Sequence, residues 1–261
     1  MDKSRYEHQQ YPLISVVIPA LNEAQNLPFV LPNIPSIVSE VILVDGHSID
    51  DTVAVAQQLL PTIRIVKQAG KGKGDAIRDG LAASTGDIII MLDADGSSDP
   101  NEIPRFVEAL MAGNDFAKGS RFTKGGGSHD ITLLRRTGNY GLSKLVNLLF
   151  RTRFSDLCYG YNAFWKYCFD YVEIDSDGFE VETLISLRIY NAHLKIVEVP
   201  SFEHQRIHGT SKLHAFKDGW RVLKTIMRER GGKASPPLQL SQLTTAVSVQ
   251  GQPSTEEIVL E

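Results

Sequence analysis

The sequence of 261 residues is poor in cysteine, with only Cys158 and Cys168. Two thiols at this separation are too few for a disulfide framework or for a structural zinc site, which need sets of cysteines at short spacings. The sequence therefore predicts reduced thiols, as in a protein of the cytoplasm.

Long apolar runs are also missing. No window approaches the roughly 18 uninterrupted apolar residues that are typical of a membrane-spanning helix. The first residues are polar and contain no apolar core of a secretory signal. We therefore expect a cytoplasmic protein that is at most peripheral on the cytoplasmic face of a membrane.

No excess of charge of one sign is present. Lys and Arg number 27 against 31 Asp and Glu, a net charge of −4. This balance gives no reason to expect nucleic acid as a partner. Any site for an anionic ligand must therefore be built locally.

The two common nucleotide-binding motifs are absent as well. The loop Gly70–Gly74 lacks the Gly-Lys-Ser/Thr ending of a P-loop and does not follow the first strand. Pro19 occupies the turn in which a dinucleotide-binding fingerprint would begin. If phosphate groups bind here, a metal ion together with arginine side chains is the natural replacement.

The chain does contain a regular alternation of predicted strands and helices. Because β-α-β-α order is typical of a doubly wound sheet, we expect an α/β fold with a Rossmann-like, mostly parallel sheet. We expect a single domain over 12–230, between polar, disordered segments at 1–11 and 231–261. The apolar, β-branched runs that predict the first four strands are 13–19, 40–46, 62–66 and 88–92.

Acidic and amide side chains follow three of these strands. Asn22 and Glu23 come after the first, Asp45 ends the second, and Asp93 and Asp95 follow the fourth. An isolated Asp-x-Asp is more often a polar turn than a site. The carboxyl ends of parallel strands share one edge, however, and ligands bind there. The shared position favours a site for a divalent cation that holds phosphate oxygens.

Basic side chains gather in loops and at one helix start. Taken singly, each is more often solvated surface charge than a ligand contact. At the start of the amphipathic helix predicted over 133–151, the helix dipole disfavours positive charge unless an anion compensates it. The residues are Arg121 after a strand, Arg135 and Arg136 at that helix start, and Arg206 and Lys212 in the loop 204–212.

Several motifs resemble those of family 2 glycosyltransferases, in the same order and at similar spacing. They are Pro19-x-x-Asn22-Glu23, Asp45-Gly46-x-Ser48-x-Asp50-x-Thr52, Gly72-x-Gly74-x-Ala76-x-Arg78-x-Gly80 and Asp93-Ala94-Asp95. Later motifs resemble the polyprenyl-phosphate (dolichol-phosphate) mannose and glucose synthases of that family. They are Gly119-Ser120-Arg121, Arg135-Arg136-Thr137-Gly138-Asn139, Asp156-x-x-x-Gly160-Tyr161 and the segment Phe202 to Leu213. The likeness extends over about residues 12–230.

The resemblance implies a GT-A fold, a UDP- or GDP-sugar as donor and a polyprenyl phosphate as acceptor. Asp93 and Asp95 would hold Mg²⁺ or Mn²⁺ on the donor diphosphate. Residues at the strand ends would bind the nucleoside, and the basic loop would close over the diphosphate. The residues implied are Pro19, Asn22, Glu23 and Asp45 for the nucleoside, and Arg206 and Lys212 for the diphosphate.

The resemblance also implies a site for the acceptor phosphate, formed by Arg121, by Arg135 or Arg136, and by Asn139. A phosphate is already anionic near neutral pH, so the expected inverting displacement needs no strong general base. It needs positive charge to position the acceptor and to stabilise the departing diphosphate. The catalytic residues expected are Asp93, Asp95, Arg121 and Arg206.

One position departs from the resemblance. Mannose synthases of this kind commonly have a glutamine two residues after the second aspartate, where this chain has Ser97, a poorer direct metal ligand. The sequence therefore leaves the sugar open.

The sequence also leaves other functions open, and it does not decide where the amphipathic helix packs. A soluble small molecule or a protein as acceptor is one alternative, and a non-catalytic nucleotide-sugar-binding module is another. A polyprenyl acceptor requires contact with a membrane surface or with a membrane partner protein. The helix 133–151 is a candidate for that contact, and packing on the sheet explains its pattern equally well.

Overall fold

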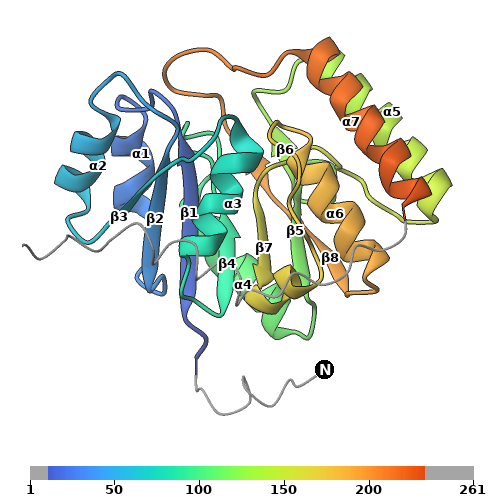
Figure 1. Ribbon diagram of the computed structural model, residues 1–261, viewed down its shortest axis with the longest axis horizontal. Helices are drawn as coiled ribbons and strands as arrows, with labels where there is room; N and C mark the ends of the chain where they lie inside the picture. The colour runs from blue at the N-terminus through green and yellow to red at the C-terminus, as the bar shows by residue number, and fades with distance from the viewer. Residues whose placement is uncertain (1–10, 233–261) are drawn as a thin grey trace, which may run out of the picture.

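The computed structural model describes residues 11–232, and its centre is one seven-stranded sheet (Figure 1). The strands lie in the order β3-β2-β1-β4-β7-β5-β8, and only β7 runs antiparallel to its neighbours. This confirms the predicted α/β class and the mostly parallel sheet. The strands are β1 Ile14–Ala20, β2 Glu40–Asp45, β3 Arg64–Lys67, β4 Ile88–Met91, β5 Phe116–Ser120, β7 Asn162–Trp165 and β8 Ile196–Pro200.

Helices cover both faces of this sheet (Figure 1). Side chains of β1 alternate between the two, with Val16 and Ile18 in one core and Val17 in the other. Each such side chain stabilises the fold by roughly 1.5–3 kcal/mol when it is fully buried. On the first face lie α1 Leu27–Val30, α2 Thr52–Leu59 and α4 Ile103–Met111; on the second lie α3 Lys73–Ala83 and α6 Val181–Asn191.

Two further helices, α5 Leu133–Phe150 and α7 Ala215–Gly231, lie side by side at the upper right of Figure 1. They bury a third apolar core against α6, where Val146 of α5 and Val222 of α7 meet Leu187. The segment between β9 and α7 arches over the upper edge of the sheet (Figure 1). Among residues 11–232, no helix is long and apolar enough to cross a membrane.

Two local expectations need correction. The pattern after the first strand predicts a helix to about Val38, but α1 ends at Val30, because Pro32 has no backbone N–H to continue it and a short 3₁₀ turn, Leu31–Asn33, follows. Three successive glycines predict a mobile linker at Gly125–Gly127, but this run is anchored. It leads into β6 Gly127–Ser128, which pairs with β9 Phe202–Glu203.

The predicted disorder of 1–11 and 231–261 concerns residues that, apart from Tyr11, Gly231 and Gly232, lie outside the described range.

Candidate active site

The predicted row of polar residues lies at one edge of the sheet, because β1, β2 and β4 are parallel neighbours. Ala20 pairs with Asp45, which places the loops after β1 and β2 next to each other. The backbone turns sharply at Asn22, which has φ 56°. Its side-chain oxygen accepts the Ile49 N–H at 2.8 Å, and its own N–H donates to the Ser48 hydroxyl at 2.9 Å.

The polar residues of the second loop therefore hold the first loop in place. Sequence reasoning predicts Ser48 or Asp50 as the N-cap of α2, and this is wrong. The N-cap residue is Asp51, without a side-chain bond to the helix. Asp50 accepts the Ala24 N–H at 3.2 Å, and Thr52 accepts the Glu23 N–H at 2.9 Å. Asp50 also accepts the backbone N–H of Thr52, the first residue of α2, at 3.1 Å, so its carboxylate bonds both to the first loop and to the start of the helix.

Asp45 and Pro19 line the same edge. The buried Asp45 carboxylate accepts the Ser48 N–H at 3.1 Å, and Pro19 lies opposite Val44 in the sheet register. Their proposed contact with a nucleoside stays a prediction.

Asp95 is held by the loop between β9 and α7. Its Oδ2 lies 2.6 Å from Nη2 of Arg206. Its Oδ1 accepts the backbone N–H of Ser97 at 2.9 Å and the Ser97 hydroxyl at 2.7 Å. Ser97 thus orients the Asp95 carboxylate. Its carbonyl also accepts the His204 N–H at 2.7 Å, which ties the basic loop to this turn.

Glu23 is a second anchor for the same loop. Its carboxylate lies 3.2 Å from Nη1 of Arg206 and 3.9 Å from Nζ of Lys212. Beside it, the Asn26 side chain and the His208 backbone exchange two hydrogen bonds, of 2.9 and 3.2 Å. The Lys212 ammonium also donates to the Leu21 carbonyl. The structure therefore brings together Glu23, Asp95, Arg206 and Lys212.

Asp93 faces a different cation. Its Oδ1 lies 2.6 Å from Nζ of Lys73, which also lies 2.7 Å from Oε1 of the buried Glu182. Burial would lower the pKa of Lys73, but the two carboxylates outweigh it and raise that pKa above its usual value. Lys73 is therefore a permanent cation beneath the acid pair.

Gly160 makes this contact possible. A Cβ at that position would lie 2.7 Å from the Lys73 ammonium, 2.9 Å from Glu182 and 3.0 Å from Asp93. A residue without a side chain is needed where the backbone comes this close to three charged groups.

Arg121 lies in a second cluster of charges. Its side chain is only 4% exposed and forms a bidentate pair with Asp156, with N–O distances of 2.7 and 3.0 Å. Nη1 lies 3.0 Å from Glu203, and the guanidinium stacks over the Tyr159 ring at 4.7 Å from its centroid. Two carboxylates therefore already saturate this arginine.

The other residues predicted for the acceptor phosphate surround this pair. The buried Asn139 donates to Asp156 at 3.0 Å and accepts the Cys158 N–H at 3.1 Å. Arg135 lies 3.5 Å from Asp130, and the exposed Arg136 lies over the Phe122 ring. Arg121 and Asn139 thus meet on one carboxylate, whereas Arg135 and Arg136 lie at the outer start of α5.

Two short connections join the clusters. The residue next to Tyr159, which covers Arg121, is the Gly160 that lies against Asp93. Glu203, which binds Arg121, is paired with Ser98 and precedes the His204 that bonds to Ser97. The acid pair and the second cluster are therefore neighbouring parts of one site.

The residues present fit a hard divalent cation that brings other ligands with it. Asp93 and Asp95 offer carboxylate oxygens, and each already attracts a fixed cation at 2.6 Å. No cluster of three or more His, Cys, Asp or Glu that could enclose a metal occurs between residues 11 and 232. Mg²⁺ is commonly bound by one or two carboxylates together with substrate phosphates and water, and this donor set matches that mode.

Sequence reasoning missed Lys73 and Glu182. The composition of the Gly70–Gly74 loop suggests a phosphate cradle, whereas its glycines allow another segment to pack closely: the Gly74 N–H donates to the Asp177 carbonyl at 2.9 Å. The sequence signal that could have identified Lys73 is its position as a basic residue within this run of glycines. Nothing in the local sequence indicated Glu182.

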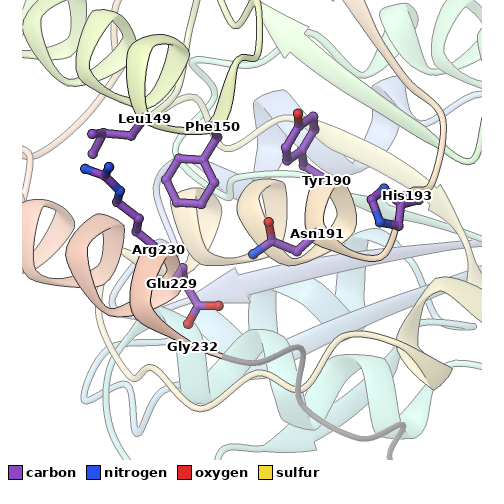
Figure 2. Close-up of a pocket in the computed structure, with 8 residues that line it drawn as sticks. All are labelled: Leu149, Phe150, Tyr190, Asn191, His193, Glu229, Arg230 and Gly232. Carbon is purple, nitrogen blue, oxygen red and sulfur yellow. The ribbon is translucent and has the colours of Figure 1, made fainter.

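A shallow hollow of about 330 Å³ lies elsewhere, where α5, α6 and α7 end (Figure 2). Phe150, Asn191 and Arg230 come from the three helices, and His193 from the loop that follows α6. The first turn of α6 carries Glu182, which shares Lys73 with Asp93, and the other end of the helix reaches the hollow. None of the predicted site residues lines it.

The seven-stranded, mostly parallel sheet with helices on both faces is the fold of the GT-A glycosyltransferases. Residues 15–172 match the family described as glycosyl transferase family 2. The chain belongs to that family.

The chain is similar to two named relatives and to one solved structure. A dolichol-phosphate mannosyltransferase of Pyrococcus furiosus is 31% identical over 230 residues, which cover 82% of this chain and 63% of that protein; this chain thus spans less than two thirds of that relative. A dolichyl-phosphate hexose transferase of Haloferax volcanii is 29% identical over 221 residues, 82% of this chain and 92% of that protein. A solved structure of glucosyl-3-phosphoglycerate synthase from Mycobacterium tuberculosis, with Mn²⁺, UDP-glucose and phosphoglyceric acid, has a TM-score of 0.64 and 25% identity, covering 86% of this chain and 82% of that one.

Proposed function

We propose that this protein transfers a hexose from a UDP- or GDP-sugar to a polyprenyl phosphate, with inversion at the anomeric carbon and with Mg²⁺ or Mn²⁺ bound. The observation that carries the proposal is the pairing of Asp93 with Lys73 and of Asp95 with Arg206, next to the second cluster of charges around Arg121. One cluster suits the donor diphosphate and the other suits an acceptor phosphate. The two relatives named as dolichol-phosphate sugar transferases support this acceptor.

In this reaction the leaving nucleoside diphosphate gains negative charge. Arg206 and Lys212 lie where they can hold that charge, and Ser97 keeps the Asp95 carboxylate in a fixed orientation. A metal ion on Asp93 and Asp95 would supply further stabilisation of the departing diphosphate as a Lewis acid. Asn22 and Asp45, with Pro19 and Glu23, form the edge proposed to bind the nucleoside.

For the acceptor phosphate we propose Arg135 or Arg136 as the outer contact, because they lie at the start of α5. Arg121 and Asn139 lie behind them, and both are bonded to Asp156. Arg121 and Asn139 can bind a phosphate only if the phosphate replaces the Asp156 carboxylate as their partner. A charge-assisted bond to a phosphate is comparable in strength to the bond to a carboxylate, so the exchange is feasible.

The test uses purified full-length protein, radiolabelled UDP-, GDP- and dTDP-hexoses, Mn²⁺ and a polyprenyl phosphate. We expect transfer to the lipid, and a loss of about 10²-fold or more in Asp95→Asn, the scale on which removal of one charge-stabilising group acts. Asp87→Asn is the matched control: Asp87 precedes β4 and bonds to the Leu13 N–H at 2.9 Å. Full activity of Asp95→Asn, or donor binding without turnover on any acceptor, would contradict the proposal.

A soluble acceptor is the second candidate, favoured by the solved relative that contains phosphoglyceric acid. An acceptor that lacks a lipid tail requires no membrane. Comparing turnover of polyprenyl phosphate with turnover of phosphoglyceric acid under the same conditions separates the two candidates.

We further propose that α5 and α7 face the membrane that carries a polyprenyl acceptor. Large apolar side chains on both helices are unusually exposed, among them Leu148 at 78%, Phe216 at 81% and Trp220 at 59%. Lys144 lies over the Tyr140 ring and Lys224 over the Trp220 ring, so basic and aromatic groups alternate. This combination suits the interface of an anionic bilayer.

Flotation with liposomes tests this contact. The full-length protein should float with vesicles that contain anionic phospholipid, and Trp220→Ser combined with Phe216→Ser should reduce the bound fraction severalfold. Met111→Ser, which removes a 54% exposed side chain from α4, is the control. If the wild type, the double variant and Met111→Ser all float equally, α7 does not take part in the proposed membrane contact.

A further inference from the structure

The two acids proposed to hold the metal are already paired with positive side chains. The Asp93 carboxylate lies 2.6 Å from Lys73, and the Asp95 carboxylate lies 2.6 Å from Arg206. The two cations differ in their freedom. Lys73 is also paired with the buried Glu182, whereas Arg206 belongs to a loop in which most residues are exposed.

The charges around Arg206 are nearly balanced. Asp93, Asp95, Glu23 and Glu182 carry four negative charges, and Lys73, Arg206 and Lys212 carry three positive ones. A divalent cation alone would come into contact with fixed ammonium and guanidinium groups. A diphosphate alone would come into contact with carboxylates. When both bind together, the metal ion can take the carboxylates and the diphosphate can take the basic side chains, so each charge keeps an opposite partner at short range.

The loop is attached on both sides of Arg206. Its backbone is bonded at His204 to the Ser97 carbonyl and at His208 to the Asn26 side chain. Arg206 also retains Glu23 as a partner at 3.2 Å. The guanidinium can therefore release Asp95 while the loop stays in place over the site.

We propose that Arg206 occupies the place of the metal on Asp95 until the donor arrives, and that the donor diphosphate draws Arg206 away as the metal takes the carboxylate. This inference rests on the proposed donor and metal. It makes the binding of metal and of diphosphate cooperative, and by thermodynamic linkage each must tighten the other by the same factor. Arg206 would then weaken the binding of the metal ion and strengthen the binding of the diphosphate.

Isothermal titration calorimetry on the full-length protein tests the exchange, with Mn²⁺, UDP and GDP as probes. In the wild type, Mn²⁺ alone should bind weakly, and saturating UDP or GDP should tighten it by about tenfold or more, within the usual range of coupling between sites. In Arg206→Gln, Mn²⁺ alone should bind severalfold more tightly, while the nucleoside diphosphate in the presence of Mn²⁺ should bind more weakly.

The control variant is Arg64→Gln, which removes the ion pair between Arg64 of β3 and Glu40 of β2, 3.3 Å apart and outside the site. It should leave both affinities unchanged. Electron paramagnetic resonance of Mn²⁺ on the wild type alone provides a measurement that requires no variant: the bound fraction should rise sharply when UDP or GDP is added.

Three results would overturn the exchange and leave the proposed function intact if the wild type still transfers sugar. These are equal Mn²⁺ affinity in wild type and Arg206→Gln, equal Mn²⁺ affinity with and without diphosphate, or weakening of both ligands by the substitution. Absence of nucleoside diphosphate binding together with absence of transfer would overturn the proposed function itself.

Discussion

At the scale of single residues, Lys118 of β5 is a fully buried charge near the site. Its Nζ donates only to the Tyr159 carbonyl, at 3.3 Å, among the hydrogen bonds of the described residues. Burial lowers the pKa of Lys118 and outweighs the attraction of Asp156, Glu182 and Glu198. The folded protein therefore holds this proton less tightly than the unfolded chain does, and the charge costs stability at neutral pH.

We predict that Lys118→Met raises the melting temperature at pH 7 by about 2–4 °C, the change that ~1 kcal/mol makes in a chain of this size. The Tyr159 carbonyl keeps the Asn162 side chain as a donor at 3.2 Å. The gain should shrink as the pH approaches 10.5, the usual lysine pKa, because the unfolded chain then loses the same proton. Thermal denaturation between pH 7 and pH 10.5 measures this gain in melting temperature. The control is Lys217→Met, which replaces an exposed lysine. A lower melting temperature at pH 7 would contradict the prediction.

At the scale of elements, the glycines that begin α3 matter because another segment of the chain packs on them. A Cβ on Gly74 would lie 2.0 Å from the Ser176 carbonyl oxygen, which belongs to backbone and cannot rotate away. We predict that Gly74→Ala destabilises the protein by about 2 kcal/mol or more and weakens donor binding, since Lys73 is its neighbour.

The matched control is Gly141→Ala in α5, where a Cβ meets nothing within 4 Å. There the substitution should stabilise the helix by up to ~1 kcal/mol, the difference in helix propensity. Urea denaturation of both variants gives the comparison. Equal effects at the two positions would show that the contact with Ser176 does not constrain the start of α3.

Apolar patterns were sufficient to predict most elements but not their directions. The run 88–92 predicts a buried strand because five successive apolar residues require burial on both faces. The residues Asn162–Trp165 have a strand-like pattern, but nothing in these four residues indicates that β7 runs antiparallel. That direction depends on pairing with β4 and β5, which lie far away in the sequence.

The candidate site was also predictable only in part. Asp45, Asp93 and Asp95 were predictable because strand ends meet at one edge. Lys73 was not, since its role depends on Glu182, which follows far along the chain. The two carboxylates on Arg121 were likewise hidden, because Asp156 and Glu203 reach it from separate loops.

At the scale of the whole molecule, the two thiols report on global unfolding. Cys158 borders the third core and Cys168 lies in the second. Burial raises the pKa of Cys158 to about 12, with a further contribution from Asp156 and Glu182, and burial raises the pKa of Cys168 well above its usual value. Almost no thiolate, the reactive form, exists on either at pH 8.

We therefore predict that an aromatic disulfide reagent labels both thiols slowly at pH 8, the buried Cys168 more slowly than the partly exposed Cys158, and that labelling becomes fast when urea unfolds the protein. Mass spectrometry of digested samples distinguishes the two sites. Rapid labelling of one cysteine in the native protein would show that its surroundings open independently of the rest.

The antiparallel β7 has a consequence for biosynthesis. The ribosome completes β5 before β7, yet β7 must be inserted between β4 and β5. Until residues 162–165 leave the exit tunnel, the nascent N-terminal half presents the bare edge of β4, and β5 has no place in the sheet. Unpaired strand edges promote aggregation. Chains terminated before about residue 165 should therefore precipitate, and a pause in translation just ahead of β7 would lengthen the time at which the growing polypeptide needs a chaperone.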